Sequence, residues 1–204
     1  MRVTRRRLAV GVLLALASAA LIVATRDPYR WWLADQSRTG RDPATYSIVE
    51  LAPGSPPPSM SVLEGVVRAD LIVEGTVERL TFGPSGRSIA LINVLSGVKG
   101  MVPMVVAVAS PSTLRPAGEA GAPVIVERPD QPILLPGRHV VLLLEHPDFG
   151  GQIPTYEVLP WVGTYLIVDG VVTTAPGNPW AATFQGMPRD EFLARLLPDD
   201  SYPH

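Results

Sequence analysis

The chain of 204 residues contains no cysteine, which excludes disulfide bridges, cysteine nucleophiles, thiolate zinc sites and lipid attachment through cysteine. Histidine occurs only three times, and charged residues make up 18 % of the chain, below the roughly 25 % of an average globular protein. Hydrophobic residues make up 47 %, which excludes a wholly disordered protein. The length allows one domain with appendages, and an apolar core has to hold that domain together.

Basic residues are concentrated at the amino terminus. Four arginines lie within residues 2–7, whereas Lys99 is the single lysine and the rest of the chain has more acidic than basic side chains. A mildly acidic surface without basic runs does not attract a phosphate backbone. The sequence therefore predicts no nucleic-acid partner.

Recognisable catalytic motifs are also missing. The chain has no H-E-x-x-H zinc motif, no G-x-S-x-G nucleophile elbow, no P-loop and no G-x-G-x-x-G dinucleotide motif. His139 and His146 stand at the two ends of a predicted strand, on opposite faces and too far apart to bind one metal ion, and His204 is the last residue. We therefore predict no catalytic residue, no cofactor-binding residue and no metal ligand, and we do not expect an enzyme.

Carboxylate pairs are the remaining catalytic arrangement. Glu74 and Glu78 lie on one face of a predicted strand, but about 13 Å of strand separates them, beyond the roughly 5–9.5 Å used in glycoside hydrolysis. We interpret that face as solvated. Asp199 and Asp200 follow the last predicted helix and are interpreted as part of a frayed tail. A metal-independent hydrolase that uses carboxylates from different strand ends remains an alternative function.

Residues 1–25 have the pattern of a membrane anchor. A basic start precedes the uncharged and mostly aliphatic residues 8–24, which as a helix span about 26 Å, close to the roughly 30 Å of a hydrocarbon core. Trp31 and Trp32 follow at the position of an interfacial aromatic belt. We predict an uncleaved single-pass anchor that contacts the lipid bilayer through residues 8–24, and a cleaved signal peptide is the alternative.

The arginines before the apolar run favour a cytoplasmic amino terminus, which places the rest of the chain outside the cytoplasm. Residues 26–59 contain several prolines and no sustained periodicity, so we interpret them as a spacer. The predicted localisation is the cell membrane with an extracytoplasmic carboxy-terminal domain, and a secreted protein is the alternative.

Residues 60–175 carry the pattern of a β domain. Ser61 and Glu64 fit a capping box that begins a short helix. Residues 69–78 then alternate between apolar and polar side chains, as in a half-buried strand. Many short strands with tight turns predict a closed or nearly closed antiparallel barrel.

Later segments add three local predictions. Five consecutive aliphatic residues, 140–144, predict a strand that is buried on both faces. Asp169-Gly170 predicts a type I′ hairpin turn because both central positions of that turn need positive φ. Residues 176–204 are predicted to contain a short helix, 188–197, followed by a tail.

Residues 110–137 form a long excursion with six prolines, within which residues 123–126 are expected to add an edge strand or to tuck onto the core. Long connections are functional or disordered, and prolines lower the entropy cost of presenting a fixed shape. We therefore predict that a protein partner binds at this 110–137 loop. Trp161 is expected in the core, whereas core and exposed positions both remain open for Trp180.

Four motifs resemble, in order, those of an uncharacterised bacterial exported domain: residues 69–77, 93–100 (with 96–97 inserted in the motif), 135–142 and 163–170. The resemblance covers about residues 60–175. It implies a fold remotely similar to the OB-type barrel of tissue inhibitors of metalloproteinases and netrin modules. Protease inhibition is not implied, because those proteins use an amino-terminal cysteine that this chain lacks.

The resulting prediction is a mainly β protein, an antiparallel OB-like barrel with a short helix at each end, preceded by one transmembrane helix. Barrels of this type bind through their loops and one exposed sheet face. The predicted function is a membrane-anchored extracytoplasmic binding or assembly module. A cleaved, secreted barrel of the same fold and a carboxylate-dependent hydrolase are the alternatives.

Overall fold

The computed structural model describes residues 45–51, 60–82, 87–117, 122–128, 131–148 and 155–197, all of which belong to one compact unit, Arg41–His204. The predicted anchor, residues 1–25, lies outside the described residues, and none of the described helices is long and apolar enough to cross a membrane. The described elements are β1 (Ser47–Glu50), α3 (Val62–Arg68), β2 (Leu71–Phe82), β3 (Arg87–Lys99), β4 (Val105–Ala117), β5 (Ala122–Glu127), β6 (His139–Asp148), β7 (Thr155–Val158), β8 (Thr164–Val168), β9 (Val171–Thr174), α4 (Ala181–Phe184) and α5 (Arg189–Leu196).

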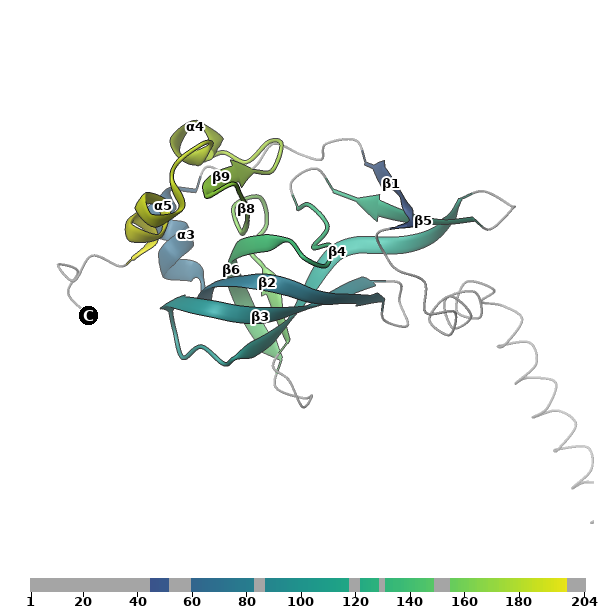
Figure 1. Cartoon of the computed structure of the whole chain (residues 1–204), viewed down its shortest axis with the longest axis horizontal. Helices are drawn as coiled ribbons and strands as arrows, with labels where there is room; N and C mark the ends of the chain where they lie inside the picture. The colour runs from purple at the N-terminus through teal and green to yellow at the C-terminus, as the bar shows by residue number, and fades with distance from the viewer. Residues whose placement is uncertain are drawn as a thin grey trace, which may run out of the picture. The chain divides into compact units, whose positions relative to one another are not determined.

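Five of the strands close into a β-barrel, which confirms the predicted architecture (Figure 1). The order around the ring is β2, β3, β4, β7, β6 and back to β2. Four of the five pairings are antiparallel, and the pairing of β4 with β7 is parallel. The barrel is therefore not antiparallel throughout, because a closed ring with an odd number of strands cannot alternate in direction at every step.

Strand β6 is buried on both faces, as its run of aliphatic residues predicts. Residues 140–144 are all fully buried. Val141 and Leu143 belong to a core cluster that includes helical residues, so the alternating Val140, Leu142 and Leu144 face the barrel interior. β6 thus contributes side chains to two hydrophobic cores, one on each of its faces.

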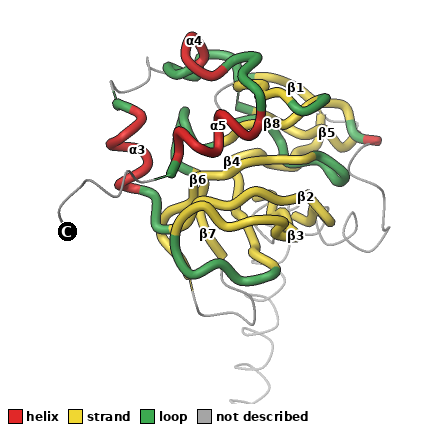
Figure 2. The backbone as a smooth tube through the Cα atoms, turned by 60° about the vertical axis from the view of Figure 1, so that its left-hand side comes forward, coloured by secondary structure: helices red, strands yellow, loops and turns green. Residues whose placement is uncertain are grey.

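The second core lies between the barrel and a layer formed by α3, α4, α5 and the β8–β9 hairpin. Figure 1 shows the three helices grouped together at the left, apart from β1 and β5, and Figure 2 draws them in red. The ring centroids of Tyr165 and Phe192 lie 4.6 Å apart, and those of Phe184 and Phe192 lie 5.0 Å apart. Ile72 of β2 belongs to the same cluster. We call α3, α4, α5, β8 and β9 the helical layer.

Side chains fix both ends of helix α3. At its start Ser61 Oγ accepts from the Glu64 N–H and the Glu64 carboxylate accepts from the Ser61 N–H, which confirms the predicted capping box. At its end Lys99 Nζ donates to three carbonyl oxygens at 2.6–2.9 Å. A cation is stabilising there because helix carbonyls carry a partial negative charge. The single lysine of the chain therefore holds a helix terminus on the barrel.

Two further local predictions are confirmed. Asp169 and Gly170 both have positive φ, 52° and 78°, between β8 and β9, as a type I′ turn requires. Helix α5 begins at Arg189 and ends at Leu196, within the predicted range of 188–197. Its buried residues, Phe192 and Leu196, face the core of the helical layer.

Candidate functional site

The segment predicted to be a partner-binding loop, residues 110–137, contains much of a three-stranded arm. β4 continues to residue 117, and β5 returns antiparallel to it, so the description of the whole segment as a loop is wrong. The expected strand at 123–126 is present within β5, but it is not an edge strand, because β5 lies between β4 and β1. β1 then pairs in parallel with β5, from a range that the sequence analysis interprets as a spacer. We call β1, β5 and residues 113–117 of β4 the arm, which extends to the right of the barrel in Figure 1.

Prolines do not prevent the arm from forming because of where they lie. Pro116 and Pro123 are directly opposite one another near the end of the β4–β5 pairing. β1 pairs only with residues 124–127 of β5, which contain no proline. The prolines therefore lie outside the part of β5 that pairs with a strand on each side, where a missing N–H would remove a hydrogen bond between strands.

One apolar row crosses the arm and ends in solvent. Leu114 of β4 lies opposite Ile125 of β5, which lies beside Ile48 of β1. Leu114 and Ile125 are buried, but Ile48 is 41 % exposed. Val49, on the other face of β1, is 47 % exposed. Both faces of β1 therefore present an uncovered β-branched side chain.

The main chain of β1 is paired on one side. The N–H of Leu51 donates to the carbonyl oxygen of Glu127 at 2.9 Å. Because successive amides of a strand point in opposite directions, the N–H groups of Ile48 and Glu50 point away from β5. β1 ends the strand order β1-β5-β4-β3-β2-β6-β8-β9, and within the described part of the chain no strand pairs with its outer edge. Among the described strands, that edge is open to one more strand.

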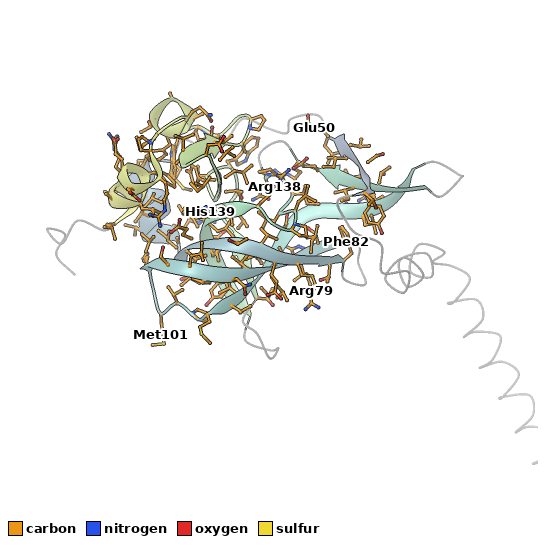
Figure 3. The ribbon with its side chains drawn as sticks, viewed as in Figure 1. Glu50, Arg79, Phe82, Met101, Arg138 and His139 are labelled. Carbon is orange, nitrogen blue, oxygen red and sulfur yellow. The ribbon has the colours of Figure 1, made fainter. Side chains whose placement is uncertain are left out.

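Two carboxylates lie side by side at one end of this edge, since Glu50 of β1 pairs with Glu127 of β5. Burial raises the pKa of Glu127, the neighbouring Glu50 raises it further, and the Ile133 N–H and Arg138 act in the opposite direction. Arg138 also donates to the Ile133 carbonyl oxygen at 3.1 Å. Figure 3 shows Glu50 on β1 and Arg138 nearer the barrel. Glu50 is therefore the exposed carboxylate of this pair, and Glu127 is the partly buried one.

A second polar group, Glu74 of β2, was expected on a solvated face, and this expectation is wrong. Its side chain is 1 % exposed because α5 packs over it, whereas Glu78 is exposed. Arg189 of α5 donates to both carboxylate oxygens, with its Nε 2.6 Å from Oε1. The Ser96 hydroxyl donates at 2.7 Å and His139 Nε2 lies 2.8 Å from Oε1. Since an ionised carboxylate only accepts, His139 Nε2 is the donor.

The hydrogen bonds decide the charge of Glu74. Burial alone raises the pKa of this carboxyl, but the donors Arg189, Ser96 and His139 outweigh burial and hold the pKa at about 2. A carboxylate held in this way does not accept a proton near neutral pH. The cluster joins β2, β3, β6 and α5, so its effect is to hold the helical layer against the barrel.

A further pair of carboxylates that the structure places opposite one another is Glu145 of β6 and Glu157 of β7. Arg68 binds both oxygens of the buried Glu145, at 2.8 and 3.0 Å, and Arg87 donates to Glu157 at 3.0 Å. Each of the two carboxylates therefore already has a guanidinium as its hydrogen-bonded partner. The geometry supports two ion pairs, one that joins α3 to β6 and one that joins β3 to β7.

The remaining predicted positions contribute little to a site. Trp161 is partly buried against the core, as expected, and Trp180 is buried with its Nε1 donating to the Met60 carbonyl oxygen at 2.7 Å. Among the described residues no group of three His, Cys, Asp or Glu side chains can hold a metal ion. Asp199, Asp200 and His204 lie outside the described residues, and the side chain of His146 lies outside the described side chains.

Comparison of the chain with protein-family models, with curated proteins and with solved structures finds no match. The comparisons therefore give no support to the resemblance to a bacterial exported domain or to the barrel of tissue inhibitors of metalloproteinases and netrin modules.

Sequence reasoning missed β1, which supplies the exposed edge. The signal that identifies it is the run of residues 46–51, Tyr-Ser-Ile-Val-Glu-Leu, which is rich in β-forming side chains and free of proline and glycine. Its proline-containing surroundings obscured that run. Its partner strand, β5, lies more than 70 residues further along the chain, so no local pattern predicts their pairing.

Proposed function

We propose that this chain is an extracytoplasmic binding or assembly module, anchored in a membrane through residues 8–24, that binds a partner by strand addition at the outer edge of β1. We further propose that its barrel is of the OB type. The ring order β2-β3-β4-β7-β6 supports that assignment. Its one parallel pair joins β4 and β7, which are the third and fifth barrel strands along the chain.

The observation that carries the proposal is the composition of β1. Soluble proteins normally protect an edge strand with lysine, proline, a bulge or a covering segment, because an open edge invites pairing with another chain. β1 has neither lysine nor proline, and its exposed Ile48 and Val49 stand next to outward-pointing amides. An edge of this kind is suited to pairing with an extended segment.

Strand addition has two components at such an edge. Main-chain hydrogen bonds supply affinity that is independent of sequence, and alternating side chains supply specificity. Here the partner's side chains contact Ile48 on one face and Val49 on the other, and Glu50 disfavours an acidic side chain directly opposite it. The partner is therefore a short extended segment with an apolar centre.

Three carboxylates of the described barrel, Glu74, Glu145 and Glu157, have structural partners and do not compete for this role. Glu74 is engaged by three side chains, and Glu145 and Glu157 are each engaged by an arginine. A cleaved, secreted form of the same barrel remains compatible with strand addition, since the β1 edge does not depend on the anchor.

The test is site-specific photo-crosslinking in the full-length protein in its native membranes. A photoreactive phenylalanine analogue replaces Ile48 in one variant and Met101 in a control, because Met101 is 95 % exposed and lies at the other end of the molecule (Figure 3). We expect adducts from position 48 that disappear when Glu50→Pro is added, since proline removes one of the outward amides. Adduct yields at position 48 no higher than at 101 would overturn the proposal.

A further inference from the structure

The partner of β1 is, we propose, the β1 strand of a second copy of this chain, in an antiparallel pair centred on Ile48. This inference rests on the proposed function, for which it names the partner. It follows from the symmetry of strand pairing, from the apolar row of the arm and from the position of Glu50.

Symmetry limits how two copies of β1 can pair. Two identical antiparallel edge strands are related by a two-fold axis perpendicular to the sheet, so residues that lie opposite one another come from the same face. The central residue then lies opposite its own copy. Only Ile48 and Glu50 of β1 have N–H groups that point outward, and a hydrogen-bonded central pair requires such a residue. Centring the pair on Ile48 keeps most of β1 within the pairing.

The apolar row supports this register. Within one copy the row runs from the buried Leu114 through the buried Ile125 to the half-exposed Ile48. Placing Ile48 opposite its own copy joins two such rows into one that is apolar over six strands. The same pairing places Ser47 opposite Val49 on the other face, so each exposed β1 side chain gains a cross-strand neighbour.

The charges are compatible with this register as well. Centring on Ile48 places Tyr46 opposite Glu50, and the two copies of Glu50 are four strand positions apart, about 14 Å. A register centred on Val49 makes Val49 a non-hydrogen-bonded central pair and places Ile48 opposite Glu50, so an apolar side chain faces a carboxylate and the apolar row is interrupted. A register centred on Glu50 brings two carboxylates face to face, which is destabilising.

The absence of cysteine allows a direct test of the register. In a hydrogen-bonded antiparallel pair the opposed Cα atoms lie about 5.5 Å apart, within the roughly 4.4–6.8 Å that a disulfide spans. Full-length Ile48→Cys protein, purified in detergent micelles and mildly oxidised, is therefore expected to migrate as a disulfide-linked dimer. Val49→Cys places its two sulfurs on strands offset by two positions, and Met101→Cys places them on a distant turn, so both are expected to stay monomeric.

Folding of each variant is checked by its thermal unfolding, and Ile48 is exposed enough for the substitution to leave the fold intact. A dimer from Ile48→Cys, with none from the two controls, supports the inference. A dimer from Val49→Cys without one from Ile48→Cys overturns the register. No cysteine dimer, together with photo-adducts from position 48 to another protein, overturns the second copy as partner while the proposed function stands. No dimer and no adduct overturns both.

Discussion

The helical layer and the arm differ in whether their polar and apolar groups have partners within the chain. Where the helical layer meets the barrel, a buried carboxylate, Glu74, receives hydrogen bonds from Arg189, Ser96 and His139, and aromatic rings pack on one another in the core of the layer. At the arm a strand leaves outward amides and two β-branched side chains in solvent. The comparison separates groups that stabilise the fold from groups that are available to a partner.

This difference has a consequence for mutagenesis. Substitutions in the helical layer are expected to lower the free energy of unfolding, because they remove burial or hydrogen bonds that already exist. Substitutions on β1 are expected to leave stability almost unchanged and to alter association. The predictions below break or sharpen that contrast, from the largest expected effect to the smallest.

The largest effect is expected from Phe192→Ala. Phe192 is fully buried and packs on Tyr165 and Phe184, so its loss leaves a cavity and lowers the free energy of unfolding by about 3–5 kcal/mol. Urea unfolding followed by circular dichroism measures the change. Leu197→Ala, at the exposed end of the same helix, is the matched control and should cost less than about 0.5 kcal/mol. Equal effects of the two substitutions would show that the aromatic cluster is not a packed core.

Arg189→Ala is expected to lower the free energy of unfolding by about 3 kcal/mol, because it leaves the buried Glu74 without its bidentate partner. The control lies on the same helix. Arg195 makes an exposed pair with Glu191, so Arg195→Ala should change the free energy of unfolding by less than about 0.5 kcal/mol. If the two arginines cost the same, Glu74 is not the group that holds α5.

Acid should remove the contribution of Glu74. Its pKa in the folded protein, about 2, lies below the ordinary value of 4.5. Its contribution to the free energy of unfolding is therefore present above pH 4.5 and is lost as the pH falls toward 2. The loss should amount to about 2–3 kcal/mol. Urea unfolding of the parent protein and of Glu74→Gln at several pH values measures it. A parent and a variant with the same pH dependence between 5 and 2 would contradict this account of the cluster.

Lys99→Met is expected to lower the free energy of unfolding by about 1–2 kcal/mol, because it removes a cation that donates to three carbonyl oxygens at the end of α3. Burial lowers the pKa of Lys99 and Asp70 opposes that change, so the group has a partly buried environment. Thermal unfolding compares this variant with Arg79→Met, which removes an exposed cation from β2 and should have little effect. A similar melting temperature for both would mean that the helix terminus is held by other contacts.

The sequence predicts those parts of the fold whose cause is local. The capping box at Ser61, the turn at Asp169 and the doubly buried strand 140–144 each follow from residues that are neighbours in the chain. Closure into a barrel also follows, from the number of short strands. The burial of Glu74 does not, because the residue that covers it, Arg189, is 115 positions away.

The candidate site was harder to predict than the fold. The excursion at 110–137 stands out by its length and prolines, and it does contain part of the arm. The exposed edge itself is β1, which pairs with β5 across a long stretch of sequence. A partner that lies far away in the chain leaves no periodicity, so only the composition of residues 46–51 marks the strand.

Hydrogen exchange of the β1 amides tests the central claim most directly. In dilute full-length protein we expect the Leu51 amide, which donates to Glu127, to be protected and the amides of Ile48 and Glu50 to exchange rapidly. Raising the protein concentration should slow exchange at Ile48 and Glu50 without changing Leu51. Amides of Ile48 and Glu50 as protected as that of Leu51 in the dilute protein would show that the edge is already covered, and would contradict the account.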